Sequence, residues 1–366
     1  MFLNYLTVFL IAAVASLALT PLVRRLSIKM GWLDKPNWRK LNKKPMPLLG
    51  GVAIYLGFLV SILLFIHKEP FVSDIHRLLG VLGSSLIIVL AGIADDTKGL
   101  SALKKLFYQI TAATIISLCG FTIMKVSSPL GGSFHLPEIA GTALTVFWIV
   151  AFINAVNLLD GLDGLSSGVV AIISGSLFFT AIKTNNPTAA ILSIAICGST
   201  LGFLPHNFYP AKIFMGDCGS MFLGFVLSLI SIEGAYKGAT FTAVIVPVIA
   251  MAIPFIDTGL AIIRRILSGR GIMKADKEHI HHHLLFREGS QKKAVLTLYG
   301  LTLSFGLIAV ALSGMKGLWA FSAILITILL TLRWLKNSKL LDFERAQPQS
   351  EENLDGREVE RKRHLL

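Results

Sequence analysis

Charged residues and cysteines are scarce in this sequence. Only 15% of its 366 residues are charged, whereas soluble domains carry about 25%, and 54% are hydrophobic. This balance excludes a disordered chain and argues against a water-soluble globule. Only three cysteines occur, two of them inside apolar runs, so we expect free thiols and no disulfide scaffold. The composition predicts an integral membrane protein.

The N-terminus lacks the basic residues that begin a signal peptide. Residues 2–22 are apolar, and the Arg24–Arg25 pair follows this run instead of preceding it. Runs long enough to cross a bilayer centre near residues 12, 57, 87, 115, 148, 173, 195, 227, 251, 304 and 326. We therefore predict an all-α polytopic membrane protein with about eleven transmembrane helices over residues 1–341. Residues 342–366 are predicted to form a charged tail.

Basic residues are almost absent from one side of the predicted membrane. Of the 34 Lys and Arg, 28 fall in the loops after odd-numbered runs or after the last run, and six fall on the other side. The positive-inside rule assigns the basic side to the cytoplasm, with the N-terminus outside and the tail inside. The net charge of +13 is thus first a topology signal, and it would also suit anionic lipid or phosphate substrates.

Acidic residues and histidines gather on that same side. An Asp at the centre of a membrane helix costs roughly 2.5–3.5 kcal/mol, so acids in apolar runs need a reason. Runs three, five and seven end in such acids, and a group of histidines follows run nine. These residues are Asp95, Asp96, Asp160, Asp163 and Asp217, and His279, His281, His282 and His283. Their placement predicts a site at the cytoplasmic face of an inner-membrane type of protein.

Adjacent carboxylates at a membrane surface favour one kind of chemistry. Neighbouring Asp side chains repel, so one is protonated or a cation lies between them. Mg²⁺ suits oxygen ligands and completes its shell with waters and substrate phosphates. Basic residues in the loops 35–44 and 264–277 would hold phosphate oxygens. The pattern predicts Mg²⁺-assisted phosphoryl transfer to or from a lipid.

Some of these residues also have a plain structural explanation. Asp160 and Asp163 lie three residues apart among glycines, and capping of a turn explains them as well as catalysis does. Asn157 would serve equally as a hydrogen-bonding contact between helices. Asp257 is expected to pair with Arg264, Arg265 or a neighbouring helix. A His cluster alone suggests zinc, but no Cys pair accompanies it, so we favour phosphate binding by these histidines.

Five segments match the motifs of a known family. They are DKPNWRKLNKKPMPLLGG (34–51), AGIADDTKG (91–99), NAVNLLDGLDGLSSG (154–168), NFYPAKIFMGDCGS (207–220) and DKEHIHHHLL (276–285). With them the chain resembles the polyprenyl-phosphate N-acetylhexosamine-1-phosphate transferases of glycosyltransferase family 4. Within that family it is most similar to the WecA or TagO type of undecaprenyl-phosphate GlcNAc-1-phosphate transferase. The match covers residues 30–290.

The resemblance implies a reaction and its participants. GlcNAc-1-phosphate would pass from UDP-GlcNAc to undecaprenyl phosphate, leaving UMP and undecaprenyl-pyrophosphate-GlcNAc. This would be the first membrane step of O-antigen, teichoic acid or similar polysaccharide synthesis. Mg²⁺ or Mn²⁺ would be the cofactor, no nucleic acid would be bound, and the wider family suggests a homodimer.

The resemblance also implies roles for individual residues. Asp217 would be the Mg²⁺ ligand that bridges the donor pyrophosphate. Asp95 and Asp96 would support the metal and the lipid phosphate, and Asp95 is our candidate for deprotonating that phosphate. The substrate-binding residues would be Asn157, Asp160, Asp163, Asn207, Phe214 (stacked on uracil), His279, His281 and His282, with Lys35, Arg39 and Lys44 holding phosphates. The chain departs from the family at Asn42, where His is common, and at His283, where Arg is usual.

Alternatives of three kinds stay open at this point. Phospho-MurNAc-pentapeptide transfer, as in peptidoglycan synthesis, or a UDP-GalNAc donor would keep the enzyme class and change the substrate. An ion-coupled transporter would place its acids near the midplane, often at broken helices, whereas these acids crowd one face. A noncatalytic lipid-binding scaffold would not need so many acids beside basic loops.

Overall fold

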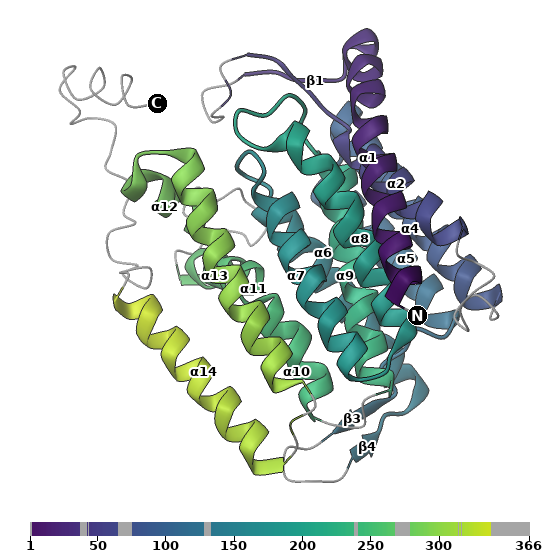
Figure 1. The fold of residues 1–366 in the computed structure, drawn as a ribbon, viewed down its shortest axis with the longest axis vertical. Helices are drawn as coiled ribbons and strands as arrows, with labels where there is room; N and C mark the ends of the chain where they lie inside the picture. The colour runs from purple at the N-terminus through teal and green to yellow at the C-terminus, as the bar shows by residue number, and fades with distance from the viewer. Residues whose placement is uncertain are drawn as a thin grey trace.

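Ten of the eleven predicted membrane runs centre on single helices, and the run centred on residue 251 is divided between two helices. The computed structural model describes residues 2–36, 42, 44–64, 75–127, 133–237, 241–267, 279–313, 315 and 317–337. In chain order its elements are α1 (Phe2–Met30), β1 (Leu33–Asp34), β2 (Met46–Pro47), α2 (Gly50–Leu64), α4 (Ile75–Lys98), α5 (Ala102–Leu118), β3 (Lys125–Ser127), β4 (Ser133–His135), α6 (Glu138–Leu159), α7 (Leu165–Lys183), α8 (Pro187–Asn207), α9 (Asp217–Lys237), α10 (Phe241–Ala250), α11 (Ala252–Leu267), α12 (Ile280–Glu288), α13 (Gln291–Leu312) and α14 (Gly317–Asn337) (Figure 1).

The prediction of an all-α polytopic membrane protein is confirmed. Among the described residues, seven helices are long and apolar enough to cross a membrane, and two shorter apolar helices accompany them. The strands in this part of the chain form two short antiparallel hairpins, β1–β2 and β3–β4. The orientation of the termini stays a prediction, and the tail 342–366 lies outside the described residues.

The ninth run differs from a simple membrane helix, because it is broken at Met251 into α10 and α11. Pro254 lies in the first turn of α11 and has no N–H for the carbonyl of Ala250, four residues earlier. The break separates the apolar α10 from α11, which carries Asp257 and ends in basic residues.

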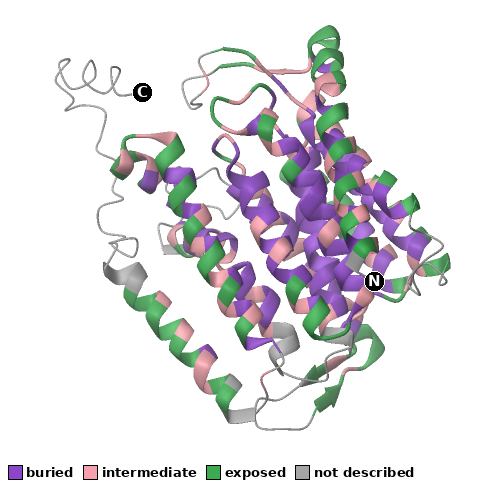
Figure 2. Cartoon of the chain, in the orientation of Figure 1, coloured by how far each residue is buried: buried purple, intermediate pink, exposed green. Residues whose placement is uncertain are grey.

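Helices α7, α8 and α9 form the buried centre of the bundle. In their membrane-length windows, 72%, 78% and 89% of the residues are buried, whereas only 22% are buried in α1, which therefore lies at the periphery (Figure 2). Helix α8 packs on α1, α2 and α7, and α9 packs on α4 and α6. Gly198 and Gly202, four residues apart on α8, face backbone carbonyls of α1 so closely that a Cβ at either would collide. This small-residue spacing lets two membrane helices touch at their backbones.

The two hairpins mark opposite ends of the bundle. Figure 1 shows β1, the loop after α8 and α12 at one end, and β3–β4 at the other. At the β3–β4 end the Arg77 guanidinium at the start of α4 pairs with Glu233 near the end of α9, and it lies 4.2 Å from the centroid of the Phe121 ring. Asn186 adds a 2.8 Å hydrogen bond to the Glu233 carbonyl. Glu233 thus joins the helices at the end opposite to the clustered aspartates.

Candidate active site

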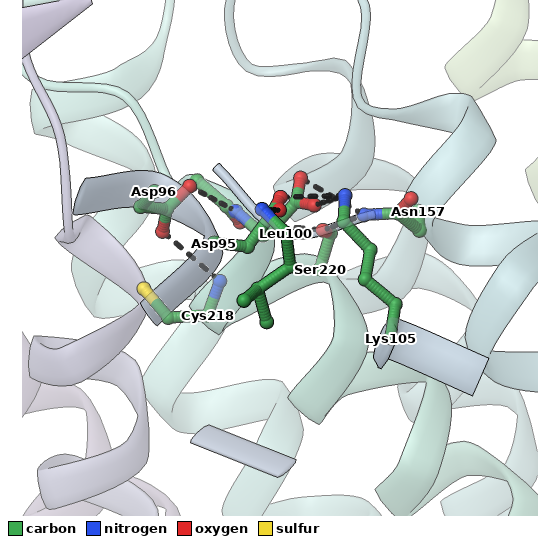
Figure 3. A network of polar contacts seen from close by, with 9 residues as sticks. Asp95, Asp96, Leu100, Lys105, Asn157, Cys218 and Ser220 are labelled. Carbon is green, nitrogen blue, oxygen red and sulfur yellow. Dashed lines mark hydrogen bonds and ion pairs between the residues drawn. The ribbon is translucent and has the colours of Figure 1, made fainter. Parts of the chain in front are cut away.

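Lys105 lies between two of the predicted catalytic carboxylates. Asp95 is in the last turn of α4, Asp217 is the first residue of α9, and Lys105 is in the first turn of α5. The Lys105 ammonium is 2.5 Å from Asp95 Oδ2 and also pairs with Asp217 Oδ2 (Figure 3). The three side chains are partly exposed, by 13% for Asp95 and 26% for the other two, so the cluster is open to a ligand.

Asp96 has a different partner from its neighbour. Its Oδ1 accepts the Asp217 N–H at 2.8 Å and its Oδ2 accepts the Cys218 N–H at 3.1 Å (Figure 3). The first N–H groups of a helix have no partner within the helix, so Asp96 caps α9 from another helix. A carboxylate is also favourable at the positive end of the helix dipole. The acid pair is therefore divided, with Asp95 on Lys105 and Asp96 on the backbone of α9.

The close approach of α4 to α9 depends on two glycines. A Cβ at Gly92 would collide with the Cys218 backbone, and a Cβ at Gly216 would collide with the Asp96 carboxylate. Gly216 also has a φ of +76°, which other residues rarely adopt. These two positions bring Asp95 and Asp217, 122 residues apart in the chain, to one point.

Asn157, in the last turn of α6, orients Asp217 by hydrogen bonding. Its Nδ2 donates to Asp217 Oδ1 at 3.1 Å and to Ser220 Oγ at 2.8 Å (Figure 3). One turn earlier, Asn154 Nδ2 donates to Gln109 Oε1 on α5 at 2.9 Å. Both amides connect helices, as the sequence suggested for Asn157, which does so within the carboxylate cluster.

The turn between α6 and α7 carries the next two predicted acids. Asp160 ends α6, and Asp163 Oδ2 accepts the Ala211 N–H at 2.9 Å, which ties the turn to the loop after α8. The Tyr299 hydroxyl of α13 donates to the Gly164 carbonyl at 2.5 Å. The turn is thus held from two sides.

Burial changes the acidity of both carboxyl groups of this turn. It raises the pKa of Asp160 to about 8, and the nearby negative charges of Asp217 and Asp96 act in the same direction. Burial also raises the pKa of Asp163 above its ordinary value, although the Ala211 amide opposes this shift. Asp160 therefore holds its proton more tightly than an ordinary aspartate does.

The loop 208–216 is fixed by backbone contacts with the first motif. The Phe214 N–H donates to the Pro47 carbonyl at 2.8 Å, and the Phe214 carbonyl accepts the Gly50 N–H at 2.9 Å. The side chain of Phe214 is half-buried. The glycines that end the first motif therefore hold the loop that leads into Asp217.

Asn207, the last residue of α8, uses its side chain to connect this loop to α7. Its Oδ1 accepts the Ser167 hydroxyl at 2.9 Å and its Nδ2 donates to the Ile213 carbonyl at 3.1 Å. The residue is only 4% exposed, so its contacts support the loop from inside.

The predicted histidines form a compact group at the start of α12. The rings of His279 and His281 are nearly parallel, with centroids 5.4 Å apart, and the centroid of His282 is 4.3 Å from that of His281. His281 packs so tightly on Gly161 that a Cβ there would strike its ring. The histidine group therefore adjoins the turn that carries Asp160. Asp257 contacts this group through His279 of α12, which agrees with the expected pairing to a neighbouring helix.

Two of the three predicted phosphate-binding residues of the first loop belong to the described part of the chain. Lys35 and Lys44 are exposed, and Arg39 lies outside the described residues. Asn42, which replaces the family's common His, donates through Nδ2 to the carbonyls of Asp34 and Lys44. It shapes the loop by hydrogen bonds to its backbone.

Lys105 is the residue at this site that the motifs missed. It lies in the first turn of α5, and its positive charge shortly after the AGIADDTKG motif was the available signal. In the sequence it counted only as one of the basic residues of a loop. Tyr299, which supports the turn, gives no comparable signal.

Magnesium binding stays a prediction, and it would use few protein ligands. Among the described residues, no three His, Cys, Asp or Glu side chains form a ready metal-binding group. Mg²⁺ does not need one, since one or two carboxylates with waters and substrate phosphates complete its shell. Asp95 and Asp217 converge on one cation, the Lys105 ammonium, and so provide two such carboxylates.

Comparisons with known proteins agree on one kind of enzyme. Residues 78–235 match the model of glycosyl transferase family 4. A probable undecaprenyl-phosphate N-acetylglucosaminyl 1-phosphate transferase of Bacillus subtilis is 39% identical, over 83% of this chain and 84% of that protein. A decaprenyl-phosphate N-acetylglucosaminephosphotransferase of Mycolicibacterium smegmatis is 35% identical, over 79% and 77%. A phospho-N-acetylmuramoyl-pentapeptide-transferase of a Thermoanaerobacter species is 31% identical, over 80% and 93%.

Proposed function

Because this chain belongs to glycosyl transferase family 4, we propose that it transfers GlcNAc-1-phosphate from UDP-GlcNAc to undecaprenyl phosphate. The products are undecaprenyl-pyrophosphate-GlcNAc and UMP. The observation that carries this proposal is the Asp95–Lys105–Asp217 cluster, in which three helices bring two carboxylates and a cation to one end of a membrane bundle. The name of the Bacillus subtilis relative supports the lipid and the sugar.

The reaction joins two anions, and the cluster addresses that difficulty. A phosphate monoester is dianionic above its second pKa, near ~6, and is then a competent nucleophile. The protein therefore has to neutralise charge and to align the two substrates, and needs no covalent intermediate. Asp217 and Asp95 would hold Mg²⁺, which would neutralise the donor pyrophosphate and polarise its phosphorus. Lys105, released from the two carboxylates, then donates to phosphate oxygen.

The proposed step is an in-line displacement. An oxygen of the lipid phosphate attacks the phosphorus that carries the sugar, and the bond from this phosphorus to the bridging oxygen breaks. UMP leaves with the bridging oxygen, and the sugar phosphate stays on the lipid. Asp95 accepts a proton where the lipid phosphate arrives protonated. We favour this direct attack over a route through a phosphorylated aspartate.

The remaining residues would hold the donor. His279, His281 and His282 adjoin the turn of Asp160 and would contact donor phosphates or sugar. Asn157, Asp163 and Asn207 would support the nucleotide, in the last two cases by fixing the loop after α8. Phe214 would stack on uracil. Lys35, Arg39 and Lys44 would attract phosphates.

The active site is proposed to face the cytoplasm of a bacterial inner membrane. The basic loops favour that side by the positive-inside rule, and nucleotide sugars are soluble and charged. A homodimer is the assembly that we propose from the resemblance to the wider family. The step would begin the synthesis of a cell-surface polysaccharide.

Release of UMP by the purified protein tests this function. Undecaprenyl phosphate and Mg²⁺ would be supplied with UDP-GlcNAc, UDP-GalNAc or UDP-MurNAc-pentapeptide in separate reactions. We expect lipid-dependent UMP only with UDP-GlcNAc, and loss of it with EDTA or in Asp217→Asn. Turnover only with the pentapeptide donor would move the protein to the branch of the Thermoanaerobacter relative. Folded protein without turnover on any donor would contradict the enzyme assignment and favour transport.

A further inference from the structure

Asp257 is a buried carboxylate outside the acidic cluster. It lies in α11, is 2% exposed, and has both oxygens engaged by the start of α12. Oδ1 accepts the Ile280 N–H at 2.7 Å, and Oδ2 lies 3.0 Å from His279 Nδ1. A buried carboxylate is costly without such partners. The acid therefore connects the broken ninth run to the histidine group.

The contact with His279 decides which ring nitrogen is available. A carboxylate oxygen only accepts hydrogen bonds, so His279 Nδ1 carries the proton that it shares with Asp257. The remaining nitrogen, Nε2, is then the one that can meet a substrate. Carboxylates fix the tautomer and the orientation of functional histidines in this manner in hydrolases and in metal sites.

The position of His279 connects this pair to the donor region. His279 is 5% exposed and its ring is parallel to that of His281, which packs on Gly161 beside Asp160. A rotation of the His279 ring would disturb this stack. Asp257 prevents the rotation from the side opposite to Nε2, because Nδ1 is bound.

We propose that Asp257 is a positioning residue for transfer, and that it holds His279 in the Nδ1-protonated form with Nε2 directed to the phosphates or sugar of the donor. This inference rests on the proposed function. Asp257 itself touches no substrate in this scheme and acts through His279. Its second contact, with Ile280, caps α12 and gives the competing explanation that Asp257 serves the helix alone.

The variant Asp257→Asn separates these two explanations. The Asn side-chain oxygen can still accept the Ile280 N–H, so the cap is kept. The amide group then faces His279 Nδ1 as a donor, which requires Nδ1 without its proton and moves the proton to Nε2. The matched control is Glu138→Gln, the same chemical change at an exposed acid at the start of α6.

Three measurements on full-length protein in detergent test the proposal. We expect Asp257→Asn to lower kcat/KM for UDP-GlcNAc by about 10- to 100-fold, as loss of an orienting partner typically does. The KM for undecaprenyl phosphate and the unfolding temperature should stay close to those of the parent. In a His279→Gln background the same change should add nothing, because the effect passes through His279. Spectra of ¹⁵N-labelled histidine, with His279→Gln for assignment, should show His279 protonated at Nδ1 in the parent and not in Asp257→Asn.

The outcomes distinguish this inference from the proposed function. Parental activity in Asp257→Asn, or an equal further loss in the His279→Gln background, would overturn the positioning role. A fall in unfolding temperature with equal losses for both substrates would reduce Asp257 to a helix cap. If the parent turns over no donor, the proposed function fails, and the histidine spectra still decide whether Asp257 sets the tautomer.

Discussion

The Asp96 carboxylate accepts the backbone N–H of Asp217, 2.8 Å away, so one acid of the pair on α4 fixes the helix on which the third acid stands. Its neighbour Asp95 meets Asp217 differently, through the shared ammonium of Lys105. Two adjacent residues of the same type therefore have separable effects on stability and on activity.

Asp96→Asn should lower both stability and activity. The amide keeps one acceptor oxygen and so leaves one of the two N–H groups of α9 without its partner, which costs about 0.5–2 kcal/mol for a helix cap. Asp95→Asn should lower activity with a much smaller loss of stability. Thermal unfolding in detergent, measured beside UMP release, checks this pair. Equal unfolding temperatures for the two variants would contradict the division of roles.

Lys105→Met should lower kcat by about 100- to 1,000-fold, the typical effect of removing one donor that stabilises charge in a transition state. The methionine fills a similar volume, so the loss reports the ammonium. Lys104→Met is the matched control, because Lys104 is the adjacent lysine and is exposed. UMP release at saturating UDP-GlcNAc measures both. A similar loss in the two variants would show that the basic character of the loop matters and that the ion pair does not.

Acid should destabilise the protein partly through His281. Burial lowers the pKa of His281 to about 3, and the charge of His282 adds to this, so the folded protein keeps the ring neutral. The unfolded chain takes up a proton below about pH 6.5, so stability is lost as the pH falls from there toward 3. Unfolding temperatures at pH 7.5 and pH 5 should differ less in His281→Gln than in the parent. His283→Gln, at an exposed ring, should keep the parental difference.

When divalent cations are removed, Asp160 should make the protein less stable as the pH rises, whereas His281 makes it less stable as the pH falls. Its pKa is raised to about 8, so the folded state retains a proton that the unfolded chain releases near pH 4. Stability from this group therefore falls as the pH rises from about 4 to 8. In EDTA, Asp160→Asn should gain in unfolding temperature relative to the parent between pH 5 and pH 8.5. A constant difference between the two proteins would contradict the raised pKa.

The Arg77–Glu233 pair should matter for stability and little for catalysis. Glu233 is 1% exposed in its side chain, and removal of one partner of a buried pair costs about 3–5 kcal/mol. Arg77→Met and Glu233→Gln should each lower the unfolding temperature, and the double variant should lose less than the sum of both. Since the pair lies at the β3–β4 end, kcat should stay near the parental value. A large fall in kcat in folded protein would indicate coupling between the two ends.

The sequence allowed the helices to be predicted, because hydropathy reports directly on the bilayer, and it allowed the gathering of the acids at one end of the bundle to be predicted. The five motifs also allowed Asp95, Asp96, Asp160, Asp163 and Asp217 to be assigned to one region. The partners of these residues were not predictable, since neither periodicity nor spacing says which helices become neighbours. Lys105 is 112 residues from Asp217 in the chain, and Asp257 is 22 residues from His279. Such pairs are decided by packing in three dimensions.

The glycines where α2, α4 and α9 meet determine how this end of the bundle can respond to a small molecule. Gly51 adjoins Gly219, and Gly92 adjoins Cys218, so main chains touch there with no side chains in between. These backbone contacts cannot adapt to a ligand by a change of side-chain rotamers. The histidine group, in contrast, lies at the start of α12 and is joined to α11 by Asp257. A selective inhibitor would therefore gain little affinity from groups that reach deeper among the carboxylates. It would gain most from groups that fit the histidine group.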